Sequence, residues 1–157
     1  FFEASKPQMI EAGFMTGEEA GDKLAWLKKV VLTSKEHVSY AAQIPEVVAM
    51  YFHDEFSFEN EEAAAVLSEE TVPTVMNMLF ELLGQLEAVD AAGIKATFKT
   101  IQKTTKLGGK SVYMPIRVAL TGNQHGPELT EIIPLLGLER TLKRIKGSLQ
   151  KAGVTLA

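Results

Sequence analysis

The chain has 157 residues, of which 46% are hydrophobic, so it is long enough for one domain or two small subdomains with a buried core. It has no cysteine, which excludes disulfides, thiolate zinc sites and thiol nucleophiles. The net charge of −4 is unevenly distributed: residues 1–90 carry 17 acids and 5 lysines, whereas residues 91–127 carry six bases and no acid. This division favours a polyanionic partner for the basic segment.

The first predicted elements are short helices. Thr16 and Glu19 have the capping-box spacing, so a helix is predicted to begin there, and Ser34 is predicted to cap the next helix. Pro45 is predicted to start a third helix, and Asn60 to cap the helix EEAAAVL.

Two stronger helices follow. Thr71 precedes a wide apolar stripe in the segment 72–86, and Asp90 is predicted to cap the next helix. In that next helix one face carries lysines at spacings of four, four and three, namely Lys95, Lys99, Lys103 and Lys106. These lysines are interpreted as phosphate contacts, and a solvated helix face is the alternative interpretation.

The last third is also predicted to be helical. Gly109 is expected to follow the end of the lysine-rich helix, and the segment SVYM at 111–114 is the one short strand candidate. Pro115 is predicted to start a short helix that stops before Gly122, and Pro127 to start another. A final helix follows Gly137. The predicted class is therefore an all-α helical bundle with two subdomains, residues 1–90 and 91–157.

No pattern of catalytic or metal-binding residues is present. The segment GGKS at 108–111 lacks the preceding glycine of a phosphate-binding loop, because Thr104 stands at that position. The three histidines lack metal-ligand spacing, and the paired acids suit helix starts. We therefore expect no catalytic residue, no metal site and no cofactor in this chain.

The termini and hydropathy suggest where the chain belongs. No apolar run reaches the roughly 20 residues of a membrane span, so no membrane partner is expected. The chain begins Phe1-Phe2 without Met and without a signal-peptide pattern. We expect a piece of a longer, cytoplasmic protein.

The loop 121–127, TGNQHGP, is the most distinctive segment. Its glycines and proline are explained by a corner between two helices. That corner does not explain why Thr121, Gln124 and His125 occur together beside a base, Arg117, with no acid before Glu128. Such a loop suits single-stranded RNA, whose bases are recognised at their edges while nearby cations neutralise phosphates.

The motif RVALTG…GPEL, with EHVSYAAQIPEVVAMYFHDEF and IKATFKTIQK upstream, resembles the C-terminal anticodon-binding region of bacterial glutamyl-tRNA synthetase. The resemblance covers essentially the whole chain. It implies an all-helical domain of a class I aminoacyl-tRNA synthetase that recognises tRNA(Glu), expected to act as a monomer. It also implies that the parent enzyme, glutamate–tRNA ligase, binds ATP and glutamate in an upstream catalytic domain.

The family's anticodon contacts carry over to this motif. Arg117 matches the arginine that contacts an anticodon base, while Pro127 and Leu129 match residues that pack against bases and bind them through backbone groups. Gly126 stands where some relatives have Thr, so their hydroxyl contact is missing here, and His125 is the residue expected to stack or donate instead.

One departure from the family concerns specificity. Glutamate and glutamine tRNAs differ in the third anticodon letter, C against G, and relatives that reject tRNA(Gln) use an Arg in their first bundle for this. The present chain has no Arg before Arg117, and its corresponding segment offers only Lys35 and His37. Recognition that also accepts tRNA(Gln) is therefore predicted. The alternative function is a helical protein–protein interaction module whose basic helix face binds an acidic partner.

Overall fold

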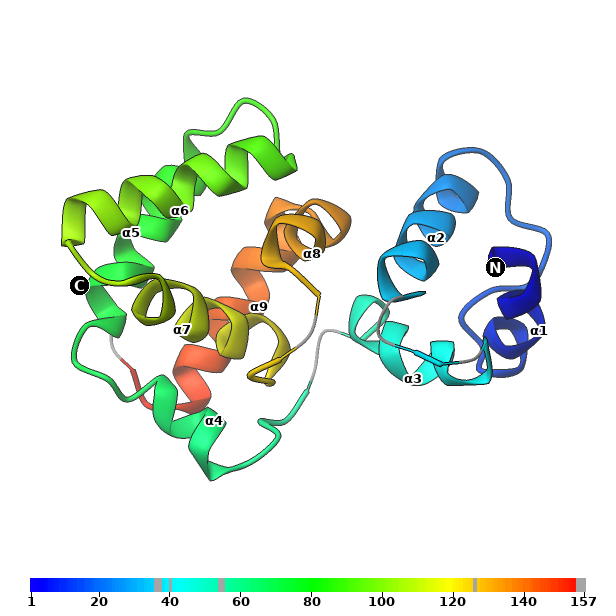
Figure 1. Cartoon of the computed structure of the whole chain (residues 1–157), viewed down its shortest axis with the longest axis horizontal. Helices are drawn as coiled ribbons and strands as arrows, with labels where there is room; N and C mark the ends of the chain where they lie inside the picture. The colour runs from blue at the N-terminus through cyan, green and yellow to red at the C-terminus, as the bar shows by residue number, and fades with distance from the viewer. Residues whose placement is uncertain (36–37, 40, 54–55, 126, 155–157) are drawn as a thin grey trace. The chain divides into compact units, whose positions relative to one another are not determined.

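The computed structural model describes residues 1–35, 38–39, 41–53, 56–125 and 127–154. These residues form α-helices and short 3₁₀ turns and contain no strand, which confirms the all-α class (Figure 1). The chain divides into two compact units, Phe1–Asp54 and Glu55–Ala157. Within the described ranges, no helix combines the length and the apolar character needed to cross a membrane.

The first unit packs three helices against one another: α1 (Phe2–Glu11), α2 (Gly21–Ser34) and α3 (Ile44–Val48). Short 3₁₀ turns at Ala41–Gln43 and Ala49–Tyr51 flank α3. The fully buried side chains of this unit come from all three helices and include Met9, Leu27, Val30, Val31, Ile44 and Val48. The core therefore depends on helix packing, since no helix is long enough to be stable alone.

The predicted start of α2 is wrong, although the hydrogen bonds of the capping box are present. The backbone N–H of Thr16 donates to Glu19 Oε1 over 2.7 Å, yet α2 begins at Gly21. Gly21 has a φ of +64°, so the right-handed helix does not continue backwards through it. Ser34, predicted to cap the next helix, is the last residue of α2, and its hydroxyl donates to the Val30 carbonyl over 3.0 Å.

The second unit contains the remaining described helices: α4 (Glu61–Val66), α5 (Val72–Gly84), α6 (Ala91–Thr105), α7 (Gly109–Thr121), α8 (Leu129–Leu136) and α9 (Leu138–Lys151). Helix α7 packs against α4, α5 and α9, while α6 packs against α5, α7 and α8. The predicted caps are confirmed: the side chains of Asn60 and Asp90 accept hydrogen bonds from the N–H groups of Ala63 (2.8 Å) and Gly93 (2.7 Å).

The predicted boundary near residue 90 lies inside this second unit. Helices α5 and α6 flank it and pack directly against each other, whereas the compact units divide between residues 54 and 55. The change from acidic to basic residues at residue 90 reflects a change in the charge of the exposed surface. Charged side chains mostly face water, so they do not indicate which helices pack in one core.

Helix α7 begins at Gly109, which corrects the prediction of a strand at 111–114 and of a helix start at Pro115. Val112, Pro115, Ile116 and Leu120 are all buried at helical spacing, so the buried face begins before the proline. The missing N–H of Pro115 removes one helix hydrogen bond, and burial of this face compensates for that loss.

Candidate nucleic-acid interface

The corner after α7 is fixed by a close backbone approach. Gly122 ends the helix in the left-handed region with a φ of +78°, and its N–H donates to the Val118 carbonyl over 2.8 Å. A Cβ at this position would lie 2.6 Å from the Ser57 carbonyl oxygen and 2.8 Å from Cδ2 of Phe56. The Gly122 carbonyl in turn accepts from the N–H of Glu59 over 2.9 Å. The segment before α4 therefore packs directly against the loop, and only glycine fits at position 122.

Thr121, predicted as a base contact, is part of this corner. Its side-chain hydroxyl donates to the Arg117 carbonyl over 2.9 Å and accepts from the Asn123 N–H over 3.2 Å. Thr121 is only 8% exposed. The structure thus gives its hydroxyl a role in shaping the loop.

The other predicted loop contacts differ in exposure. His125 is exposed, Pro127 and Leu129 are buried, and Gly126 lies outside the described residues. Helix α8 begins at Leu129, so the predicted start at Pro127 is two residues early, and Glu128 is the N-cap. Pro127 contributes through its backbone, because its carbonyl accepts a hydrogen bond from Arg117.

Arg117 is the residue that ties α7 to the start of α8. Its Nη1 donates to the Pro127 carbonyl over 2.7 Å. Burial lowers the pKa of its guanidinium, and the neighbouring Glu128 carboxylate opposes this by raising it. The ordinary pKa of arginine is so high that the group stays charged at neutral pH. A guanidinium has five N–H donors, so one fixed hydrogen bond orients the group and leaves donors for a ligand.

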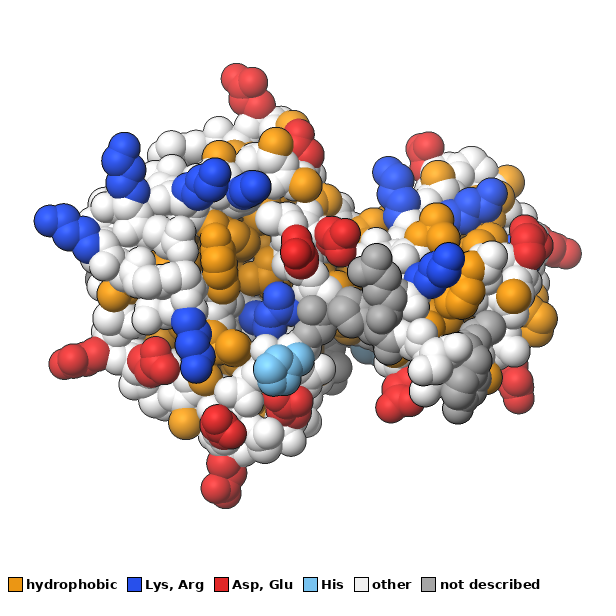
Figure 2. Space-filling view, viewed as in Figure 1, with side chains coloured by type: hydrophobic (Ala, Val, Ile, Leu, Met, Phe, Trp, Pro, Cys, Tyr) orange, Lys and Arg blue, Asp and Glu red, His pale blue; other side chains and the backbone are white. Residues whose placement is uncertain are grey.

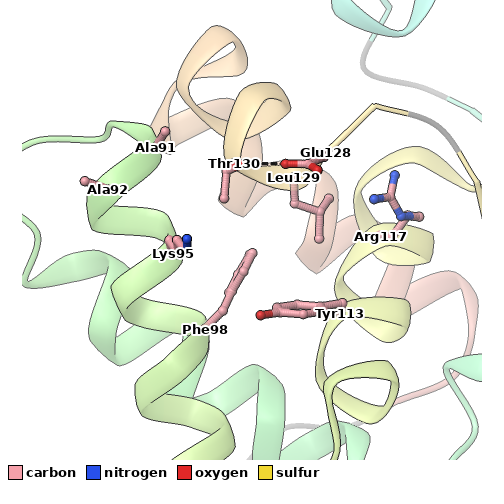
Figure 3. Close-up of a pocket in the computed structure, with 9 residues that line it drawn as sticks. All are labelled: Ala91, Ala92, Lys95, Phe98, Tyr113, Arg117, Glu128, Leu129 and Thr130. Carbon is pink, nitrogen blue, oxygen red and sulfur yellow. Dashed lines mark hydrogen bonds between the residues drawn. The ribbon is translucent and has the colours of Figure 1, made fainter. Parts of the chain in front are cut away.

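A cleft of about 600 Å³ opens beside Arg117, between α6, α7 and the start of α8 (Figure 3). The residues that line it are Ala91, Ala92, Lys95, Phe98, Tyr113, Arg117, Glu128, Leu129 and Thr130. The rings of Phe98 and Tyr113 meet edge to face with centroids 5.2 Å apart. Phe98 is buried, while Tyr113 is 36% exposed. The cleft therefore has an aromatic side with one accessible ring, on which a planar base can stack.

The predicted lysine stripe leads into this cleft. Lys95, Lys99, Lys103 and Lys106 are all exposed, and Lys95 also lines the cleft. Figure 2 shows Lys and Arg side chains in a row over α6, next to apolar side chains. Cations beside an aromatic cleft match the arrangement in which phosphates are neutralised while bases are bound.

We expect removal of a single stripe lysine to weaken RNA binding without regard to sequence. For Lys99→Ala, the slope of log K against log salt is expected to flatten by roughly 0.7 to 0.9, because one fewer phosphate is neutralised. Titrating the chain with an anticodon stem-loop RNA at several salt concentrations measures this slope. If alanine variants of all four lysines leave the slope unchanged, the lysines do not contact phosphate and the alternative interpretation, a solvated helix face, is correct.

The remaining predicted contacts belong to the first unit. Lys35 follows α2, and its Nζ lies 5.5 Å from the centre of the Phe1 ring, a cation–π contact. His37 lies outside the described residues. Within the described part of the chain, no group of three or more His, Cys, Asp or Glu is placed to hold a metal ion.

Of the nine lining residues, only Lys95, Arg117 and Leu129 were predicted as contacts, so Phe98, Tyr113 and Glu128 are among those that the sequence did not indicate. Tyr113 lies in the segment that was a strand candidate, and Glu128 was noted only as the first acid after the acid-free segment. Tyr113 and Arg117 are four residues apart, the spacing that places two side chains on one helix face. The strand prediction at 111–114 concealed this signal.

The chain matches the family model described as "Anticodon binding domain" over residues 1–149. It is 42% identical to glutamate–tRNA ligase 1 of Caldicellulosiruptor saccharolyticus, over 89% of this chain and 29% of that protein. It is 41% identical to the glutamate–tRNA ligase of Bacillus licheniformis, over 94% of this chain and 30% of that protein. The chain thus spans about 30% of the length of these curated relatives.

The fold is also found in a solved structure. The chain superposes on the crystal structure of a glutamate tRNA ligase from Elizabethkingia meningosepticum with a TM-score of 0.80 and 24% identity, covering 96% of this chain and 29% of that one. On the strength of the family model and the identity to curated relatives, the chain belongs to the anticodon-binding domain family of bacterial glutamate–tRNA ligases.

Proposed function

We propose that the chain recognises the anticodon of tRNA(Glu) for a glutamate–tRNA ligase, while another part of that enzyme binds ATP and attaches glutamate to the tRNA. One observation carries this: Arg117, oriented by the Pro127 carbonyl, faces an aromatic cleft that the lysines of α6 approach. This arrangement supplies edge donors, a stacking surface and phosphate neutralisation in one place. The curated relatives are glutamate–tRNA ligases. We further propose that the enzyme works as a monomer in the cytoplasm.

The test is binding of the 157-residue chain to an anticodon stem-loop RNA of tRNA(Glu), compared with the same stem carrying a scrambled anticodon. The glutamate stem-loop is expected to bind at least about fivefold more tightly, because one good base contact contributes about 1–3 kcal/mol. The chain alone is expected to form no glutamyl-tRNA. Equal affinity for both RNAs would contradict anticodon recognition and favour the protein–protein interaction module.

The proposal extends to relaxed specificity at the third anticodon letter. Cytosine presents acceptors at O2 and N3, which a guanidinium recognises, whereas guanine presents N–H donors that a guanidinium repels. The first unit contains no arginine for this choice. The ammonium group of Lys35 is a point charge, so it cannot make the planar, bidentate hydrogen bonds of a guanidinium with cytosine.

Stem-loops that differ only in C or G at the third anticodon position are expected to bind the chain with affinities within about fivefold of each other. A guanidinium contact of about 1–3 kcal/mol, equivalent to roughly 5- to 150-fold, is absent. Fluorescence anisotropy titrations with both RNAs measure the ratio. A preference for C of about a hundredfold would show that a different side chain enforces the choice.

A further inference from the structure

Glu128 places a carboxylate in a cleft whose other charged lining residues are cations. It is the first acid after the acid-free segment 91–127, and it lines the cleft with Lys95 and Arg117. Figure 3 shows Lys95 and Arg117 on opposite sides of the cleft, with Glu128 between them along a third side. A cleft built for phosphate would exclude this carboxylate, because like charges repel at short range.

The residue type at position 128 is not explained by helix capping. Glu128 is the N-cap of α8, yet its side chain makes no capping hydrogen bond. Ser, Thr, Asp and Asn are the types that stabilise this position. The carboxylate instead accepts a hydrogen bond at Oε2 from the Thr130 hydroxyl over 3.4 Å, a contact drawn in Figure 3. A contact of this length is weak, and the Glu128 side chain is exposed, so the carboxylate is accessible to a ligand in the cleft.

The three charged groups form an ordered hydrogen-bonding pattern. Lysine and arginine only donate, and an ionised glutamate only accepts, so Lys95, Glu128 and Arg117 present donor, acceptor and donor around the cleft. Arg117 is oriented by its bond to the Pro127 carbonyl, while the lysine ammonium moves on a flexible four-carbon stem and adapts its position.

A base that satisfies this pattern needs acceptor, donor and acceptor along one edge. Uracil has this edge, with carbonyl oxygens O2 and O4 on either side of N3–H. Cytosine offers an acceptor at N3, where the carboxylate requires a donor, and adenine offers an acceptor at N1. Guanine has N1–H but places a second donor, N2–H₂, where the pattern requires an acceptor. An acceptor that faces an acceptor stays unpaired, which makes the mismatch unfavourable.

We propose that Glu128 is a specificity-determining residue that selects a uracil of the anticodon by accepting its N3–H, while Lys95 and Arg117 donate to its two carbonyl oxygens. This inference rests on the proposed function, since it names the base that the anticodon cleft takes. The ring lies against Tyr113, and the negative charge of Glu128 keeps phosphates out of the cleft and on the exposed lysines of α6.

The test compares Glu128→Gln with the unmodified chain, using stem-loops in which each anticodon uracil in turn is changed to cytosine. At one position the unmodified chain is expected to prefer uracil by about 5- to 150-fold. Glutamine presents both an acceptor and a donor, so its amide pairs with either base. For Glu128→Gln the uracil-to-cytosine ratio at that position is expected to fall to within about threefold of one.

The matched control is Glu131→Gln. Glu131 is an exposed acid on the same helix and does not line the cleft, so this variant removes the same charge without touching the pattern. It is expected to raise affinity for all RNAs alike and to keep the unmodified ratio. A stem-loop with N3-methyluridine at the selected position, which lacks the N3–H donor, is expected to bind the unmodified chain as weakly as the cytosine RNA.

Three results would be decisive. A uracil-to-cytosine ratio that Glu128→Gln leaves unchanged at every anticodon position overturns this inference, and anticodon-dependent binding would still stand. Equal loss of the ratio in Glu131→Gln also overturns it, because general charge would then be the cause. If no anticodon change affects binding of the unmodified chain, the proposed function itself fails. Thermal unfolding of both variants checks that each is folded.

Discussion

Replacing Gly122 with alanine is expected to destabilise the second unit by about 2–5 kcal/mol. The left-handed backbone at φ +78° accounts for roughly 1–2 kcal/mol of this with any L-residue. The added methyl group would lie 2.6 Å from the Ser57 carbonyl oxygen and 2.8 Å from the Phe56 ring, and such overpacking typically costs a further 1–3 kcal/mol or so. Urea unfolding followed by circular dichroism, compared at equal m-value, measures the loss.

Two alanine variants in the same unit separate these contributions. Gly84 ends α5 with open space around its Cβ position, so Gly84→Ala is expected to be neutral or stabilising by up to about 1 kcal/mol. Gly153 has a φ of +73° and also faces open space, so Gly153→Ala carries the backbone effect alone. If Gly122→Ala and Gly153→Ala lose the same stability, the close approach to Ser57 contributes nothing.

Arg117→Ala is expected to reduce binding of the glutamate stem-loop by about 5- to 150-fold, and to reduce binding of a scrambled stem-loop much less. The physical reason is that the Pro127 carbonyl holds the guanidinium at the edge of the cleft. From there its remaining N–H groups can donate to the base that we propose the cleft binds. One good arginine–base contact contributes about 1–3 kcal/mol of discrimination. Anisotropy titrations of both RNAs at one salt concentration give the two losses.

Two further variants identify the cause of the Arg117 effect. Arg117→Lys keeps the positive charge but loses the planar set of guanidinium donors. Compared with Arg117→Ala, it is therefore expected to restore affinity for both RNAs without restoring the preference for the glutamate anticodon. Lys143→Ala removes an exposed cation of α9 that does not line the cleft, and it is expected to leave the preference intact. Equal losses on both RNAs for Arg117→Ala would make Arg117 a phosphate contact or a structural residue.

The parts of the fold that were predicted correctly are those set by neighbouring residues. Asn60 and Asp90 cap helices because their side chains reach an N–H three residues ahead. Gly122 ends α7 because its own backbone angles allow a left-handed turn. The start of α2 and the extent of α7 were wrong, because Gly21 interrupts a good capping pattern and tertiary burial of Val112 extends the helix past Pro115.

The sequence by itself determined the all-α class, the basic segment and the RVALTG…GPEL motif, because composition, periodicity and motif are properties of order along the chain. Only the tertiary structure decided that Phe98, Tyr113 and Glu128 line one cleft with Arg117. These residues come from α6, α7 and the start of α8, and their proximity depends on how those helices pack. It likewise divided the chain at residues 54 and 55 and not near residue 90. The distribution of charge along the chain can be read directly from the sequence. Which helices pack into one core depends on contacts between residues that are far apart in the sequence.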